Sequence, residues 1–263
     1  MTDKILVFIP CYNCAPQITR VLAQFDIKTT GYFKEILVLD NQSKDSTISA
    51  AIEAGKKIAG IGIPIGKNAA NYNLGGSHKA AFKYALSHNF THLVVLHGDD
   101  QGHIADMLPV LQRNEHHFHD ACLGARFMPD SSLIGYSRFR IFGNRVFNFI
   151  FSLGTGNPVK DLGSGLNIFS RRIMEDQKIM HYADDLRFNV YLLLGIFQQG
   201  MKAKYFPISW REDDQVSNVK MTSQALKTLQ LLWLSLLGGE NFRAKDHRTI
   251  IHTEYLFDVI YKQ

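Results

Sequence analysis

Short apolar runs alternate with helix-like segments along this chain, and that alternation limits the folds it can adopt. The runs have no polar face and are bounded by polar or turn residues, which is typical of strands in a sheet covered by helices on both faces. Strands that alternate with helices predict parallel βαβ units, so we expect an α/β fold with an open, mostly parallel, Rossmann-like sheet. The expected strands are residues 5–9, 35–39, 92–96, 121–127, 166–169 and 204–210, and the expected helices are residues 17–25, 46–58, 77–86 and 104–112.

The length of the chain suits one large domain. Its 263 residues are 46% hydrophobic and 20% charged, a composition that supports a buried core and excludes disorder as the dominant state. No internal repeat and no linker rich in proline or serine divides the chain. We expect one main domain over residues 1–220, followed by a C-terminal helical tail over residues 221–263.

The cysteine content and the net charge indicate the cellular compartment of the protein and the kind of molecule that it binds. Three cysteines cannot form a disulfide framework, which predicts a reducing compartment such as the cytoplasm. The longest apolar stretch, residues 226–237, is interrupted by polar side chains, so we expect no span across a bilayer. The net charge of +5 suits an anionic substrate or an acidic surface. Scattered basic residues without a reader motif argue against a nucleic-acid partner.

Polar clusters follow several of the expected strands directly. In open α/β sheets, ligands bind beyond the carboxyl ends of the strands. Residues 10–13, residues 40–43, residues 97–101 and Arg126 all stand at such positions. A bare scaffold needs only turn residues there, so we interpret this edge of the sheet as the functional one.

The cluster with the strongest chemical signal is residues 97–101. Asp99 and Asp100 lie beside His97 and Gln101, and together they offer oxygen and nitrogen ligands to Mg²⁺ or Mn²⁺. Such an ion neutralises a departing diphosphate by Lewis-acid catalysis. The alternative is an acidic turn that caps the next helix.

Two further clusters carry weaker signals. Asp40 at a strand end is well placed to accept hydrogen bonds from a base or a ribose, although a capped turn explains it equally well. Residues 73–77 open a helix whose backbone N–H groups could meet an anion. Their spacing matches neither a dinucleotide-binding fingerprint nor a P-loop.

The ordered set of these motifs resembles the family 2 glycosyltransferases. Among them, it is most similar to the polyprenyl-phosphate sugar transferases typified by dolichyl-phosphate mannose synthase. The resemblance covers roughly residues 4–220. The motifs that carry it are residues 9–13, 38–47, 73–76, 96–101, 124–127, 143–148, 160–165 and 206–211.

The resemblance implies a GT-A fold, an inverting transfer and a donor such as a UDP- or GDP-hexose. Pro10, Tyr12 and Asp40 would hold the nucleoside, and the 73–76 motif adds Asn73 and Gly75 to the donor site. The metal motif of the family, D-x-D followed by Gln two residues later, carries over to His97, Asp99 and Gln101. Its first Asp is His97 here, and imidazole suits Mn²⁺ or softer ions better than Mg²⁺. Asp100 could compensate, and Cys14 replaces the usual Glu after Tyr-Asn.

The resemblance also assigns basic and sugar-site positions. Arg126, Arg138, Arg211 and Lys220 match positions used around donor and acceptor phosphates. Cations there would offset the repulsion between two anionic substrates. Surface solubility is the alternative for any one of them. The family's Asp-x-x-Ser-Gly element beside the sugar carries over to Asp161 and Ser164.

The acceptor is open between a polyprenyl phosphate and a saccharide or glycan hydroxyl. A phosphate is already nucleophilic at neutral pH, whereas a hydroxyl requires a carboxylate base, for which Asp184 and Asp185 are candidates. A helix cap explains these two acids as well. The resemblance places either reaction in the synthesis of cell-envelope polysaccharides.

An aromatic, basic segment bears on lipid access. Residues 136–153 hold five of the 18 Phe, interleaved with arginines, and residues 225–237 include Trp233. Such helices lie in a membrane interface or pack into a core. If lipid contact occurs, we expect it to be peripheral, at the inner face of the membrane.

Two rival functions stay open. Cys11 and Cys14 form C-x-x-C between a strand and a helix, as in thiol–disulfide oxidoreductases. The replacement of an acid by His97 leaves room for a protein that binds a nucleotide sugar without turning it over. His116, His117 and His119 suggest a metal, although we interpret them as an exposed helix end.

Overall fold

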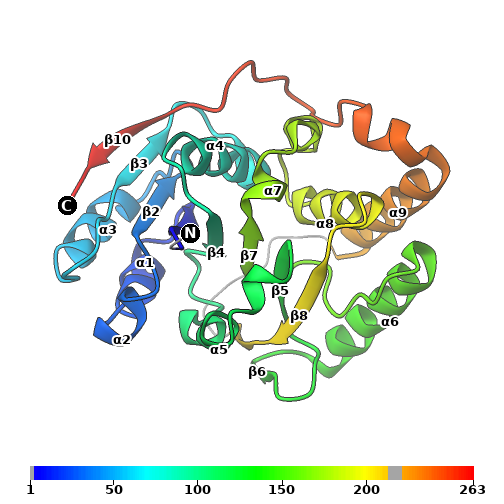
Figure 1. Ribbon diagram of the computed structural model, residues 1–263, viewed down its shortest axis with the longest axis horizontal. Helices are drawn as coiled ribbons and strands as arrows, with labels where there is room; N and C mark the ends of the chain where they lie inside the picture. Colours follow the sequence, from blue (N-terminus) through cyan, green and yellow to red (C-terminus); the bar gives the residue numbers. More distant parts are fainter. Residues whose placement is uncertain (1–2, 213–220) are drawn as a thin grey trace.

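The computed structural model describes residues 3–212 and 221–263, and it shows an α/β fold built on one large sheet (Figure 1). The eight strands lie in the order β10-β3-β2-β1-β4-β7-β5-β8. β7 and β10 run antiparallel to their neighbours, and the other pairings are parallel. The predicted mostly parallel sheet is therefore confirmed. The strands are β1 (Ile5–Cys11), β2 (Glu35–Asp40), β3 (Ile65–Asn68), β4 (His92–Leu96), β5 (Ala121–Ala125), β7 (Leu166–Ser170), β8 (Ala203–Pro207) and β10 (Phe257–Tyr261).

Helices cover both faces of the sheet because successive strand residues point to opposite sides. Leu6 and Phe8 of β1 join the core on one face, and Val7 and Ile9 join the core on the other. The first face is covered by α4 (Asn73–Ser87), α6 (Arg138–Thr155), α7 (Arg171–Met174), α8 (Phe188–Gln198) and α9 (Met221–Ala244). The second face is covered by α1 (Ala15–Leu22), α3 (Thr47–Gly55), η1 (Ile104–Met107) and α5 (Leu108–Gln112). The other short elements are α2 (Ile27–Thr30), η2 (Glu115–His117), η3 (Gln177–His181) and the pair β6 (Ser132–Ile134) and β9 (Ser209–Arg211).

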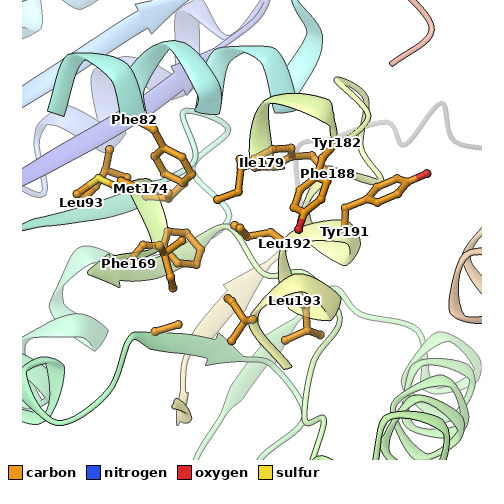
Figure 2. Close-up of a cluster of buried hydrophobic side chains, with 14 of the residues drawn as sticks. Phe82, Leu93, Phe169, Met174, Ile179, Tyr182, Phe188, Tyr191, Leu192 and Leu193 are labelled. Atoms are coloured by element: carbon orange, nitrogen blue, oxygen red, sulfur yellow. The ribbon is translucent and has the colours of Figure 1, made fainter. Parts of the chain in front are cut away.

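Aromatic rings fill the first core between α4, β7 and α8 (Figure 2). The ring of Phe82 lies 6.0 Å from that of Phe169 and 6.5 Å from that of Phe188, measured between centroids. Edge-on and tilted contacts of this kind stabilise aromatic pairs beyond the burial of their area. Several of the phenylalanine side chains therefore pack in the core.

Each predicted strand corresponds to one observed strand except that over residues 204–210. The predicted strand over residues 204–210 is two strands, because β8 pairs with β5 as far as Pro207 and β9 then pairs with β6. β3 was not predicted, since Gly66 and Lys67 break its apolar pattern. Short strands of this kind carry little periodic signal.

The predicted C-terminal tail is helical only in part. α9 is helical on both sides of a bend at Gly239, whose φ is 48°. β10, however, is a strand that pairs antiparallel with β3, so the expectation of a helical tail is wrong for residues 257–261. Its β-branched and aromatic residues favour a strand, and the ring of Phe257 covers the bare backbone at Gly66.

The β3–β10 pairing can be tested at Gly66. A Cβ added there would lie 2.6 Å from Cδ2 of Phe257 and 3.2 Å from Cδ1 of Leu39. We expect Gly66→Ala to lower the free energy of unfolding by about 1–3 kcal/mol, measured by urea denaturation, since the ring must move. Gly62→Ala is the control, because its Cβ would meet nothing closer than 3.7 Å. Equal unfolding midpoints for the two variants would show that the ring does not pack there.

Candidate functional site

A cavity of about 380 Å³ opens at the carboxyl ends of β1, β2 and β4. A volume of this size is typical of small-molecule sites. Five of the predicted site residues line it: Pro10, Tyr12, Asn73, His97 and Asp99. Lining residues that sequence reasoning did not assign include Asn41, Asn71, Leu74, Ser77 and Leu186. Residues that follow β1, β2 and β4 therefore border one cavity.

The floor of the cavity is fixed by backbone contacts around Gly98. The N–H of Gly98 donates to the carbonyl of Pro10 at 3.1 Å, and the N–H of His97 donates to that of Gly165 at 3.0 Å. A Cβ at Gly98 would lie 2.7 Å from Sγ of Cys11. The position between His97 and Asp99 therefore requires glycine, because the end of β1 approaches it so closely.

His97 is held as a neutral imidazole. Burial lowers its pKa to about 4, and the positive charge of Arg126 acts in the same direction. Its Nδ1 lies 4.0 Å from Oδ2 of Asp99, and its Nε2 is buried with no hydrogen-bond partner among the described residues. Metal–ligand bonds are about 2.1 Å long, so one ion can span two ligands at this separation. A neutral imidazole and a carboxylate therefore fit a divalent transition-metal ion such as Mn²⁺.

Asp100 does not face this site. Its carboxylate accepts hydrogen bonds from Nε of Arg20 at 2.6 Å and from Nη2 of Arg211. The two arginines neutralise it, so it does not compensate for the histidine at position 97. Arg211, predicted to bind phosphate, instead clamps the turn, since its N–H also donates to the carbonyl of Gln101 at 3.0 Å. Within the described chain, the residues lining the cavity do not include Gln101, whose N–H donates to Asp99 Oδ1 at 3.2 Å.

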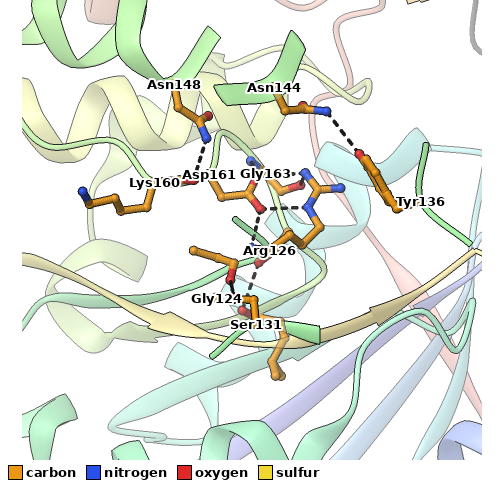
Figure 3. A network of polar contacts seen from close by, with 12 residues as sticks. Gly124, Arg126, Ser131, Tyr136, Asn144, Asn148, Lys160, Asp161 and Gly163 are labelled. Carbon is orange, nitrogen blue, oxygen red and sulfur yellow. Dashed lines mark hydrogen bonds and ion pairs between the residues drawn. The ribbon is translucent and has the colours of Figure 1, made fainter. Parts of the chain in front are cut away.

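Arg126 and Asp161 bind each other in a network of polar contacts (Figure 3). Nε and Nη2 of Arg126 donate to the two carboxylate oxygens of Asp161 at 2.7 and 2.8 Å. Burial alone would lower the pKa of Arg126, but the Asp161 carboxylate outweighs it and raises that pKa. Ser164 is buried beside them and lines, with Asp161, a separate space of about 20 Å³, enough for one water. Asp161, predicted to lie beside the sugar, is thus held in an ion pair with Arg126, and Ser164 lines the same small space as Asp161.

Of the two polar residues at the end of β2, Asn41 lines the cavity and Asp40 does not. Asp40 is buried; its Oδ2 accepts from the N–H of Ser43 at 3.0 Å, and its Oδ1 has no partner in the described part of the chain. Asn41 lines the cavity, donating to Oδ1 of Asn71 at 2.8 Å and accepting from the N–H of Tyr72 at 2.8 Å. Asn41 was missed, although its place directly after a buried strand is the same signal that selected Asp40.

The start of α4 is less open to an anion than its sequence indicates. The N–H of Gly75 is taken by the carbonyl of Asp184 at 2.6 Å. A Cβ at Gly75 would lie 2.7 Å from the carbonyl oxygen of Ala183 and from Cβ of Phe188, so glycine is needed here for close packing. Asn73 lines the cavity and has a φ of 56°.

Both predicted bases are engaged with cations. Oδ1 of Asp184 lies 2.7 Å from the buried Nζ of Lys79 and accepts from the hydroxyl of Tyr255 at 2.8 Å. Asp185 accepts from Nη2 of Arg187 at 2.7 Å. Burial would raise the pKa of Asp185, but the hydrogen bonds from Arg187 outweigh it and lower that pKa. Each carboxylate therefore has a cationic partner within hydrogen-bond distance, and Asp185, whose pKa is lowered, is poorly suited to act as a general base.

Residues with left-handed backbone gather around the site. Asn13 follows β1, Gln42 follows β2, Asn73 opens α4 and Asp100 follows β4, all with positive φ. Residues other than glycine adopt this conformation at a cost, and such residues concentrate at functional sites. The loops at this edge are therefore tightly specified in shape.

Arg138 does not line the cavity, whereas Cys11 and Cys14 do. Arg138 is exposed at the first turn of α6. Lys220 lies outside the described residues. Cys11 and Cys14 are buried free thiols, and their mutual hydrogen bond together with burial raises the pKa of Cys11. A thiol with a raised pKa is a poor nucleophile, which disfavours the oxidoreductase alternative.

Sequence comparison identifies the family. The family model described as glycosyl transferase family 2 matches residues 6–177, which include the strand ends that border the cavity. This chain is a family 2 glycosyltransferase. No curated protein matches its sequence.

Solved structures share the fold of this glycosyltransferase. Glucosyl-3-phosphoglycerate synthase from Mycobacterium tuberculosis, in complex with UDP, has a TM-score of 0.62 at 16% identity, over 90% of this chain and 80% of that one. A complex of the same synthase with Mn²⁺, UDP and glucosyl-3-phosphoglycerate has a TM-score of 0.60. S. aureus TarS 1–349 has a TM-score of 0.57 at 14% identity, over 90% of this chain and 66% of that one. The GT-A fold expected from the sequence is confirmed.

The floor of the cavity can be tested at Gly98. We expect Gly98→Ala to lower sugar-transfer turnover at least about tenfold, because the added Cβ would displace the His97–Asp99 turn from Cys11. Gly102→Ala is the matched control: it lies on the far side of Asp100, and its Cβ would meet nothing closer than 3.8 Å. Turnover is measured as release of nucleoside diphosphate. Comparable rates for the two variants would contradict the close approach.

Proposed function

We propose that this glycosyltransferase moves a hexose from a UDP- or GDP-sugar to a polyprenyl phosphate, with inversion, in cell-envelope polysaccharide synthesis. We also propose that it works in the cytoplasm at the inner face of the membrane. The observation that carries the proposal is the cavity bordered by His97 and Asp99 at the carboxyl ends of β1, β2 and β4. Family membership supports the assignment of that cavity as the donor site.

The donor is proposed from the cavity and from the neighbours. Structures of the M. tuberculosis synthase contain UDP or UDP-glucose, which favours a UDP-sugar for this chain. Asp40 has a buried oxygen without a protein partner among the described residues, and such an oxygen suits a donor group of the nucleoside. Tyr12 lines the cavity and is half-exposed, so its ring is available to pack against a base.

The metal is proposed on the two side chains that fit it. Asp99 and His97 would hold Mn²⁺ or Mg²⁺, of which the imidazole favours Mn²⁺. When bound, a divalent ion neutralises the charge on the leaving diphosphate. The turn around Gly98 positions both ligands, and the Arg211–Asp100 pair keeps that turn in place.

The choice of acceptor rests on the cationic partners of the two candidate bases, Asp184 and Asp185. Asp184 is bound to Lys79, and Asp185 is bound to Arg187 with a lowered pKa. A saccharide hydroxyl would need one of them as its base, whereas a phosphate oxygen attacks without one. The geometry therefore favours a phosphate acceptor over a glycan hydroxyl.

The exposed face of α6 and α9 supports a lipid-linked acceptor. The two helices lie side by side at the end of the molecule opposite β10 (Figure 1). Phe151 is buried, but Phe139 and Phe149 of α6 are 77% and 62% exposed, and Trp233 of α9 is 64% exposed. Exposed aromatic side chains beside the exposed Arg145 suit an interface with anionic lipid. None of the helices in residues 3–212 and 221–263 is long and apolar enough to span a bilayer.

The metal role can be tested at Asp99. We expect Asp99→Asn to lower turnover at least about 100-fold with the fold intact, and EDTA to abolish the turnover of the parent until Mn²⁺ is restored. Asp258→Asn is the control, since Asp258 is an exposed acid on the remote strand β10. Near-normal turnover of Asp99→Asn, or full activity in EDTA, would remove the ion from the mechanism.

The lipid role can be tested on α6. We expect the double variant Phe139→Ser, Phe142→Ser to bind vesicles of anionic phospholipid at least about tenfold more weakly, because two exposed aromatic side chains are lost. Ile27→Ser is the control, because Ile27 is 92% exposed on α2. Co-sedimentation measures the partition. Unchanged binding of the double variant would contradict a lipid-facing α6.

The alternatives are separated by a screen of donors against acceptors. UDP- and GDP-hexoses are paired with polyprenyl phosphate, an oligosaccharide or 3-phosphoglycerate, and released nucleoside diphosphate is measured. Release that depends on polyprenyl phosphate supports the proposal. Release that occurs only with the oligosaccharide or only with phosphoglycerate would contradict polyprenyl phosphate and identify that compound as the acceptor. Donor binding without release in any arm would identify a binding protein, the second candidate that His97 keeps open.

A further inference from the structure

A second group of metal-ligating side chains lies at the opposite edge of the sheet from the cavity. Asp3 precedes β1, and His116 and His117 belong to η2. Because β1 is seven residues long, this group is roughly 20 Å from the strand ends that form the donor site. It is therefore distinct from the proposed site at Asp99.

The three ligand atoms converge. Oδ2 of Asp3 lies 3.1 Å from Nε2 of His116 and 2.7 Å from Nε2 of His117, and the three atoms all lie within 4.8 Å of one another. Ligands around a tetrahedral zinc ion stand about 3.3 Å apart. A small adjustment of these side chains would thus admit an ion between them.

The surroundings hold one imidazole rigidly and leave another accessible. His116 is 3% exposed, its Nδ1 has no hydrogen-bond partner in the described residues, and the ring of His92 packs 4.9 Å from its ring. The side chain of His117 is 42% exposed, so an ion can reach the group from solvent. His119 does not join them, since its Nδ1 contacts the carbonyl of Glu115 at 2.8 Å.

We propose that Asp3, His116 and His117 bind one divalent transition-metal ion of the zinc class, with water as the fourth ligand. Two imidazoles and one carboxylate suit Zn²⁺, Ni²⁺ or Co²⁺, whereas Mg²⁺ prefers a shell of oxygen atoms. The ion ties the segment before β1 to η2, which are more than a hundred residues apart in sequence. It acts as a structural clamp and takes no part in sugar transfer.

The proposal is tested by zinc titration of untagged, metal-free protein carrying Asp99→Asn, which silences the donor site. We expect this parent to bind one equivalent of Zn²⁺ by calorimetry and to unfold at a higher temperature when Zn²⁺ is added. Adding His117→Ala should weaken zinc binding by at least about 100-fold and abolish the thermal shift, because even outer-shell partners of a metal are worth about 10- to 100-fold. His88→Ala, an exposed histidine at the end of α4, should change neither.

A second variant separates loss of a ligand from loss of the fold. Asp3→Asn keeps the shape of the side chain but removes its charge, and should weaken zinc binding while circular dichroism stays unchanged. A parent that binds no zinc, or variants at Asp3 and His117 that bind it as tightly as the parent, would overturn the proposal. Both results leave the proposed sugar transfer untouched, because that is measured with Asp99 intact.

Discussion

The parallel alignment of β2, β1 and β4 is the constraint on which the site depends. Cys11 pairs with Asp40, and Phe8 pairs with Val95, so the three strands end at the same edge. Parallel strands covered on both faces form a rigid platform, and their following loops open together. The backbone hydrogen bond from Gly98 to Pro10 then joins two of these loops into one floor. The backbone alone therefore determines where the loops that carry the site residues come together.

Several of the predicted charged site residues are paired with one another or with other charged side chains. Asp161 holds Arg126, and Asp100 accepts hydrogen bonds from Arg20 and Arg211. A buried carboxylate that has an arginine or a lysine beside it stays charged and fixed in direction. Within the described residues, none of these five side chains lines the cavity, so the pairs fix the segments around it.

The sequence predicted the fold well, because the fold depends on local pattern, and the predicted site lies at the strand ends that border the cavity. The apolar strands and the polar residues that follow them are visible along the chain, and Pro10, Tyr12, His97 and Asp99 were found in this way. The partners of the acids could not be predicted. Asp161 binds an arginine 35 residues away, and Asp184 binds a lysine 105 residues away. Only folding brings such residues together. A motif that contains one acid therefore does not reveal which cation will bind it.

The last strand of the sheet has a consequence for how the protein is made. β10 pairs with β3, although about 190 residues of the chain separate the two strands. During synthesis, β3 presents an unpaired edge to the cytosol until residues 257–261 have left the ribosome. Exposed edges invite pairing with other chains, and contacts between distant segments form slowly. The sheet therefore gains its last strand only when the C-terminal segment has been made.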